Sequence, residues 1–152
     1  MIKDNKKIII IPARLAASRL PGKPLAEIGG KPMIQLVWER AIAADIAPVY
    51  VATDDRDIAN VITSLGGKAV MTRTDHPSGS DRIFEAVETI DPDKNISQIL
   101  NLQGDLPDLS PDIPNLLAVI LDQGETDLAT LVTPASQDEA SRNQVVKAVV
   151  SW

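Results

Sequence analysis

Four consecutive isoleucines, Ile8–Ile11, constrain the fold more than any other feature of the sequence. A strand with one face in solvent alternates apolar and polar residues, whereas a strand in a parallel sheet is covered on both faces and is apolar throughout. The run therefore predicts a buried parallel strand. We expect Pro12 to end it. Arg14, Arg19 and Lys23 would then lie in an irregular loop at the carboxyl end of the strand.

Short apolar segments and segments with helical spacing alternate along the rest of the chain. Further strands are predicted at residues 49–53, 68–72, 97–102, 128–132 and 145–150. Helices are predicted to begin at Lys31-Pro32, Asp54-Asp55, the segment before Ile83, and Ser110-Pro111. Strands that alternate with helices form right-handed βαβ units. We therefore expect a Rossmann-like α/β fold with three α/β/α layers and a mainly parallel sheet.

Length and composition narrow the class of protein. A chain of 152 residues with 44% hydrophobic residues fits one domain with a real core. The absence of cysteine excludes disulfides and thiolate metal sites. A net charge of −6 argues against a general affinity for nucleic acid. The isoleucine run is too short for a signal core or a membrane span. We expect a cytoplasmic protein that binds neither nucleic acid nor a membrane.

The loop after the isoleucine run is locally basic in this acidic chain. Between residues 13 and 31 the only acid is Glu27, and the cations are Arg14, Arg19, Lys23 and Lys31. Ligands of open α/β sheets bind at the carboxyl ends of the strands, and guanidinium and ammonium groups suit phosphate oxygens. The loop thus favours a nucleoside triphosphate over the alternative of a solvated basic loop. The kinase loop GxxxxGK[ST] and the dinucleotide fingerprint GxGxxG are absent.

Asp105 stands directly after another predicted strand, in the loop Gln103-Gly104-Asp105. A carboxylate there can hold Mg²⁺, which commonly takes one or two protein carboxylates together with phosphate oxygens. The alternative is that Asp105 only makes a turn before Pro107.

A third loop, residues 73–82, leads into a predicted helix. Its small residues at positions 78–80 can accept an anion or hydrogen-bond a base, and Ser80 can serve as a plain helix cap. His76, before Pro77, is more typical of a loop-shaping residue than of a catalyst. Asp54 and Asp55 are interpreted as acids favoured by the dipole at a helix N-terminus.

Together these loops resemble the nucleotidyltransferases that activate sugars, and most closely the 3-deoxy-manno-octulosonate (Kdo) cytidylyltransferase family. The resemblance covers the whole chain in order. Its segments are IIPARLAASRLPGKPL at 10–25, GGKPMI at 29–34, VATDD at 51–55, MTRTDHPSGSDR at 71–82, NLQGDLP at 101–107 and VVKAVV at 145–150. One departure is Leu106, where family members often have an acid.

The resemblance implies a nucleotidyltransferase fold and a set of site residues. The residues implied to hold the CTP phosphates and to act in catalysis are Arg14, Arg19 and Lys23. Those implied to surround the cytosine and ribose are Ala13, Arg73, Ser78 and Gly79, with Gln103 near the nucleotide or the sugar acid. Asp105 is implied to bind Mg²⁺.

The implied reaction transfers a cytidylyl group from CTP to Kdo, giving CMP-Kdo and pyrophosphate, for bacterial lipopolysaccharide synthesis. Family members are longer and are expected to form homodimers. Residues 1–152 are thus expected to be the nucleotide-binding part of a C-terminally truncated cytidylyltransferase domain, and to turn over poorly or not at all. The alternatives are a nucleotidyltransferase for another sugar acid and an inactive CTP-binding fragment.

Overall fold

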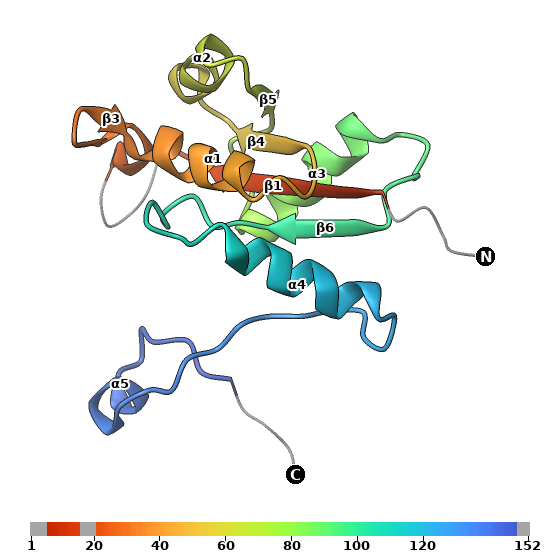
Figure 1. Ribbon diagram of the computed structural model, residues 1–152. Coiled ribbons are helices and arrows are strands. Elements are labelled where there is room, and N and C mark those ends of the chain that lie inside the picture. The colour runs from red at the N-terminus through yellow and green to blue at the C-terminus, as the bar shows by residue number, and fades with distance from the viewer. Residues whose placement is uncertain (1–5, 16–20, 149–152) are drawn as a thin grey trace.

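A four-stranded parallel sheet forms the centre of the computed structural model, which describes residues 6–15 and 21–148 (Figure 1). In chain order its strands are β1 (Lys7–Ala13), β4 (Val49–Thr53), β5 (Lys68–Met71) and β6 (Gln98–Asn101). Across the sheet the order is β5-β4-β1-β6, and every neighbouring pair is parallel. The predicted α/β class with a mainly parallel sheet is confirmed.

Helices connect these strands and cover both faces of the sheet. The helices are α1 (Met33–Ala43), α2 (Arg56–Ser64), α3 (Gly79–Ile90), α4 (Asp112–Asp122), the short α5 (Gln137–Ser141) and a 3₁₀ turn η1 (Lys23–Leu25). A small hairpin of β2 (Glu27–Ile28) and β3 (Lys31–Pro32) precedes α1. Gly29 and Gly30 make its turn with φ of 58° and 80°, a conformation that glycine adopts without strain.

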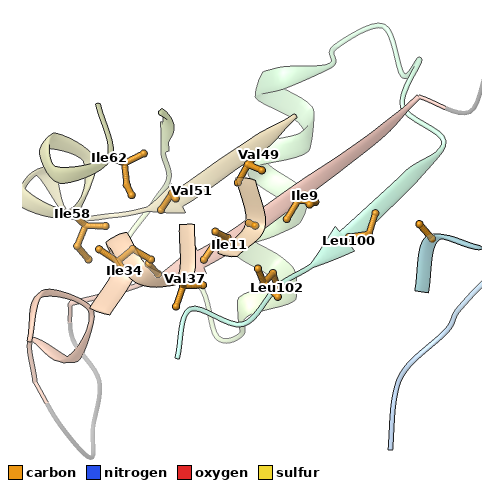
Figure 2. Close-up of a cluster of buried hydrophobic side chains, with 13 residues drawn as sticks. Ile9, Ile11, Ile34, Val37, Val49, Val51, Ile58, Ile62, Leu100 and Leu102 are labelled. Atoms are coloured by element: carbon orange, nitrogen blue, oxygen red, sulfur yellow. The ribbon is translucent and has the colours of Figure 1, made fainter. Parts of the chain in front are cut away.

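The isoleucines of β1 explain the layers. Ile9 and Ile11 pack in a cluster with residues of α1, α2 and α4 (Figure 2), whereas Ile8 and Ile10 pack on the opposite face with residues of α3. All four side chains are buried, and each buried isoleucine contributes about 1.5–3 kcal/mol. An uninterrupted apolar run is needed because neither face of β1 meets solvent. The three-layer α/β/α arrangement is confirmed.

The topology creates a crevice between β1 and β6. The chain leaves β1 through α1 toward β4, and it later crosses from β5 through α3 to β6, on the opposite face. The order of the strands therefore reverses at β1, because β4 lies on one side of it and β6, which follows later in the chain, lies on the other. Such a switch point is where ligands bind in open α/β sheets.

Pro12 does not end the first strand, contrary to the prediction, because β1 continues to Ala13 and Pro12 pairs with Ala52. Hydrogen bonds alternate along β1: the amide of Ile9 faces β4, and the carbonyl of Ile10 faces β6. The nitrogen of Pro12 therefore faces β6, whose ladder with β1 has already ended at Ile10. The missing N–H of proline costs no ladder bond there.

The strands predicted at 128–132 and 145–150 are wrong for the residues that the structure describes, of which 149 and 150 are not part. Residues 128–132 and 145–148 have no strand. Leu128, Val132 and Val146 are 79%, 69% and 96% exposed. Apolar β-branched residues favour a pleated surface, but a strand also requires a neighbour for its backbone groups. In Figure 1 the chain after α4 runs away from the sheet. Within the described ranges, no helix has the length and apolar character needed to cross a bilayer.

Candidate functional site

A pocket of about 270 Å³ opens at the carboxyl ends of β1 and β6. Its lining comes from the loops after these strands, from η1 and from the start of α3. Seven of the predicted site residues line it, namely Ala13, Arg14, Lys23, Ser78, Gly79, Gln103 and Asp105. The structure thus brings together residues from the three loops that the sequence singled out.

Gly104 allows the β6 loop to pass directly against the end of β1. A Cβ at position 104 would lie 2.8 Å from the carbonyl oxygen of Pro12, closer than real Cβ atoms approach backbone. Only glycine fits here without a shift of the backbone. Its neighbours Gln103 and Asp105 consequently line the pocket beside the end of β1.

Lys23 and Asp105 form an ion pair across the pocket. Lys23 begins η1 directly after Gly22, whose φ of 75° turns the chain and whose amide closes the loop by donating to the carbonyl of Leu15 at 3.0 Å. The Nζ of Lys23 lies 2.8 Å from the Oδ2 of Asp105. Both side chains are partly exposed, at 38% and 52%. A ligand can therefore reach the ammonium and the carboxylate.

Two predicted site residues are not placed with the others. Arg19 lies outside the described residues. Arg73 does not line the pocket. Its side chain is 69% exposed, and its Nε lies 3.5 Å from Asp75 and 3.9 Å from Glu85, beside a neighbouring surface hollow.

The N-terminus of α3 forms the third wall of the pocket. Its cap is Ser78, not Ser80 as predicted: the extended backbone of Ser78 places its Oγ to accept from the amide of Asp81 at 3.2 Å. This is the usual bond between an N-cap oxygen and the third residue of a helix. The hydroxyl of Ser78 also donates to the carboxylate of Asp81. Gly79 begins the helix at the pocket.

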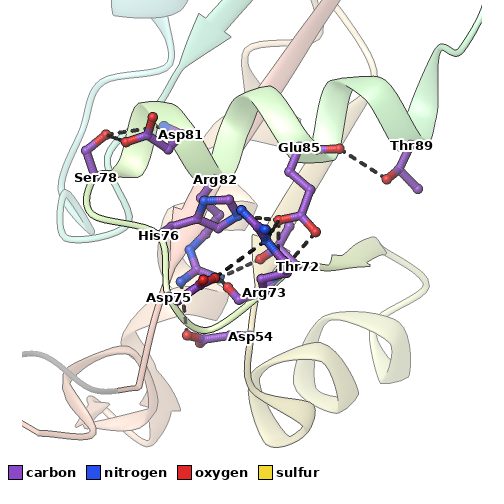
Figure 3. A network of polar contacts seen from close by, with 10 residues as sticks. All are labelled: Asp54, Thr72, Arg73, Asp75, His76, Ser78, Asp81, Arg82, Glu85 and Thr89. Atoms are coloured by element: carbon purple, nitrogen blue, oxygen red, sulfur yellow. Dashed lines mark hydrogen bonds and ion pairs between the residues drawn. The ribbon is translucent and has the colours of Figure 1, made fainter.

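Sequence reasoning missed several residues of the pocket wall, above all Arg82, which is 2% exposed. His76 was interpreted only as a loop-shaping residue; it lines the pocket and is 8% exposed. One signal could have indicated Arg82: it stands directly before Ile83, with which the apolar face of its helix begins. Asp55 caps α2 as predicted, accepting from Asp57 and Ile58, but Asp54 does not, because it pairs with Arg82 (Figure 3).

Glu85 on α3 holds the 73–76 loop. Its carboxylate accepts a hydrogen bond from Nε2 of His76 and another from the amide of Arg73 at 3.1 Å (Figure 3). The bond from His76, aided by that amide and by the nearby side chains of His76 and Arg73, holds the pKa of the Glu85 carboxyl below its ordinary value of 4.5, although partial burial opposes this. Glu85 therefore stays ionised to a lower pH than an ordinary glutamate.

Carboxylates for a metal ion are sparse in this pocket. Across residues 6–15 and 21–148, no three or more His, Cys, Asp or Glu side chains are grouped so that they could hold a metal. A cation such as Mg²⁺ would thus depend on Asp105 together with oxygens of a ligand. This donor set fits Mg²⁺, which usually keeps waters and takes few protein carboxylates beside phosphates.

Comparisons with known proteins show the family of the chain. The model of a family described as "Cytidylyltransferase" matches residues 8–151. A 3-deoxy-manno-octulosonate cytidylyltransferase of Rhodopseudomonas palustris strain BisB18 is 52% identical over 151 residues, which are 97% of this chain and 61% of that protein. The enzyme of the same name from Azorhizobium caulinodans is 52% identical over 143 residues, 93% of this chain and 57% of that protein. The chain thus spans about three fifths of the curated relatives that it matches.

Solved structures agree with these sequence comparisons. The structure of a CMP:2-keto-3-deoxy-manno-octonic acid synthetase complexed with CTP superposes with a TM-score of 0.71 and 48% identity, over 79% of this chain and 49% of that one. A cytidylyltransferase from Leptospira borgpetersenii has a TM-score of 0.66 at 24% identity, over 79% of this chain and 50% of that one, and shows the shared fold.

Proposed function

The chain belongs to the cytidylyltransferase family, and on this premise we propose that its pocket binds CTP as the nucleotide-binding part of a 3-deoxy-manno-octulosonate cytidylyltransferase. The proposed reaction joins CTP and Kdo to give CMP-Kdo and pyrophosphate, the activation step for lipopolysaccharide synthesis. The curated relatives of about 50% identity bear this enzyme name, and the solved synthetase of 48% identity is a complex with CTP.

The observation that supports the proposal most strongly is the meeting of Arg14, Lys23 and Asp105 in one pocket at the switch point of the sheet. Two cations and one carboxylate are the groups that a magnesium triphosphate requires. We propose that Arg14 and Lys23, together with Arg19, hold the phosphates of CTP. Guanidinium and ammonium groups suit phosphate oxygens, the first through its planar fork and the second as a compact charge.

We assign the nucleoside to the wall formed by the start of α3. Ser78 and Gly79 there, with Ala13 at the end of β1, would surround the cytosine and ribose, and Gln103 would lie near the nucleotide or the sugar acid. The side chain of Arg73 receives no nucleotide contact in this proposal, because it does not line the pocket.

The chemistry is a displacement at phosphorus. The anomeric hydroxyl oxygen of Kdo forms a bond to the α-phosphorus of CTP, and the bond from that phosphorus to the oxygen bridging to the β-phosphate breaks. Pyrophosphate leaves, and the hydroxyl proton passes to solvent. No covalent enzyme intermediate is needed. Arg14 and Lys23 would align the phosphates and stabilise the negative charge that develops on them and on the departing pyrophosphate.

We propose that Asp105 supplies the protein carboxylate for Mg²⁺. Bound there, the ion would neutralise charge on the triphosphate oxygens. Asp105 is half-exposed in the pocket, so its carboxylate is accessible once Lys23 turns to a phosphate. We also propose that the complete protein acts as a cytoplasmic homodimer. This proposal rests on the family resemblance.

The direct test measures pyrophosphate release from CTP and Kdo in the presence of Mg²⁺, using the protein that the whole reading frame encodes. We expect release that requires both substrates and that is lost with Lys23→Met. Release that is equally fast with ATP or without Kdo would refute the proposal.

A further inference from the structure

One buried guanidinium joins three segments beside the pocket (Figure 3). Arg82 lies in the first turn of α3. Its Nη2 donates to Oδ2 of Asp54, just past β4, at 2.9 Å. Its Nη1 donates to the hydroxyl of Thr72 and, at 3.2 Å, to the carbonyl of Arg73, just past β5. Arg82 therefore ties the ends of β4 and β5 to the helix that forms one wall of the pocket.

Glu85 on the same helix completes this arrangement. It accepts from the amide of Arg73 and from the ring of His76, so both polar groups of the Arg73 main chain, the N–H and the C=O, are bonded to side chains of α3. The loop 72–78 is thus fixed where it leads into α3. Ser78 and Gly79 at this point line the pocket.

Arg82 is not itself available to a phosphate. The side chains of Arg82 and Asp54 are only 3% and 10% exposed, and the carboxylate neutralises the guanidinium at 2.9 Å. Lysine could not replace this arginine, because one ammonium nitrogen cannot reach acceptors on both strand ends as a planar fork does.

The pocket has walls of different charge. The loop after β1 contributes Arg14 and Lys23, which suit a triphosphate, and the loop after β6 contributes Asp105. The α3 wall contributes uncharged Ser78 and Gly79 together with Arg82, whose guanidinium is neutralised by Asp54. The carboxylate of Asp81 in the first turn of α3 offsets the positive end of the helix dipole. An uncharged base and ribose suit this wall better than a phosphate does.

We infer that Arg82, assisted by Asp54 and Glu85, positions the 72–78 loop and thereby shapes the nucleoside half of the pocket without affecting the triphosphate half. The inference rests on the proposed function, because it takes a cytidine nucleotide as the ligand. Arg82 is a positioning residue that acts through Ser78 and Gly79.

The test compares two ligands, CTP and inorganic tripolyphosphate, by calorimetric titration of the purified protein. In Arg82→Lys we expect the dissociation constant of CTP to rise about tenfold or more, because buried acceptors lose their donor. The constant for tripolyphosphate should stay within about twofold. Lys23→Met is the matched control, and it should weaken both ligands.

Hydrogen exchange supplies a readout that does not depend on the ligand. In Arg82→Lys the amides of residues 72–78 should exchange faster, while those of β1 keep their protection. Equal losses of affinity for CTP and tripolyphosphate in Arg82→Lys, or unchanged exchange in the loop, would overturn this inference but not the proposed function. A wild-type protein that binds neither ligand overturns the proposed function as well.

Glu85→Gln keeps the experiment decisive if Arg82→Lys does not fold. This variant leaves the buried pair of Arg82 and Asp54 intact and weakens only the bonds to Arg73 and His76. We expect the affinity for CTP again to fall more than the affinity for tripolyphosphate, but by a smaller factor than in Arg82→Lys. If Glu85→Gln weakens CTP and tripolyphosphate equally, the inference is wrong.

Discussion

The ammonium of Lys23 lies 2.8 Å from the carboxylate of Asp105, although 82 positions separate the two residues in the sequence. They meet because the loops after β1 and β6 flank the switch point of the sheet. In the absence of nucleotide, each group neutralises the other. A magnesium triphosphate offers each of the two groups a new partner: phosphate oxygens for Lys23 and the cation for Asp105. The exchange is cheap because an exposed ion pair contributes only about 0–1 kcal/mol.

Lys23→Met should impair the reaction far more than the fold. We expect kcat/KM for CTP to fall about a hundredfold or more, as for loss of other donors to a developing oxyanion. The free energy of unfolding should change by less than about 1 kcal/mol, since the ion pair is exposed. Pyrophosphate release and urea unfolding measure the two effects.

Lys31→Met is the control for this prediction. Lys31 also forms an exposed ion pair, with Nζ 2.9 Å from Glu39, but it does not line the pocket. An equal loss of activity in both lysine variants would show that general charge, not the pocket, explains the effect.

Asp105→Asn should greatly reduce the tightening of CTP binding by Mg²⁺. In the wild-type protein, adding Mg²⁺ should tighten CTP binding, because the carboxylate and the phosphates share the cation. In the variant the tightening by Mg²⁺ should be largely lost. Asp108→Asn removes the same charge from the same loop outside the pocket and should retain the effect of Mg²⁺. An undiminished effect of Mg²⁺ in Asp105→Asn would exclude Asp105 as the ligand.

Gly104→Ala should destabilise the fold by about 1–3 kcal/mol, as overpacking of a tight site does. The cause is the 2.8 Å approach of the added Cβ to the carbonyl oxygen of Pro12. Gly79→Ala is a useful comparison, because its Cβ would come no closer than 3.4 Å to Pro12 and alanine favours the helix that begins there. Urea unfolding should give Gly104→Ala a clearly lower free energy of unfolding than Gly79→Ala. Equal stabilities would contradict the close approach.

The stability contributed by Glu85 should depend on pH. Its pKa is lowered in the folded state from the ordinary value of 4.5, chiefly by the bond from His76. As pH falls, the unfolded chain therefore takes up the proton first. The stability that Glu85 contributes is present in full above pH 4.5. It is lost as the pH drops through the pKa that Glu85 has in the folded state.

Glu85→Gln should accordingly be less stable than the wild type at neutral pH, and the difference should shrink in acid. Unfolding by urea at a series of pH values measures this difference. Glu88→Gln removes the next carboxyl of α3, which does not bond to Arg73 or His76 in the way Glu85 does, and should show no such trend. A wild-type advantage over Glu85→Gln that is constant from about pH 7 to about pH 3 would contradict the proposed cause.

The fold was largely predictable because its core strands are short, apolar and separated by helices. The segment 49–53 was predicted with the bounds that β4 has in the structure. The β2-β3 hairpin was missed since two-residue strands show no periodicity. The strand predicted at 128–132 was wrong, as was the described part, 145–148, of the strand predicted at 145–150, because propensity alone does not supply a partner strand.

The site was predictable only where a loop follows a strand. Parallel strands bring their carboxyl ends to one edge, so Arg14, Lys23 and Asp105 could be expected to converge. The pairing of Asp54 with Arg82 depends on which strands are neighbours and on where α3 crosses them. Neither strand order nor the packing of α3 follows from the sequence pattern.

The most direct measurement is a calorimetric titration of the purified chain with CTP in the presence of Mg²⁺, run beside an identical titration with ATP. If the pocket between β1 and β6 is a CTP site, CTP should bind and ATP should bind more weakly, and Lys23→Met should abolish or greatly reduce the heat of CTP binding. No binding of CTP, or binding of ATP as tight as that of CTP, would contradict the assignment.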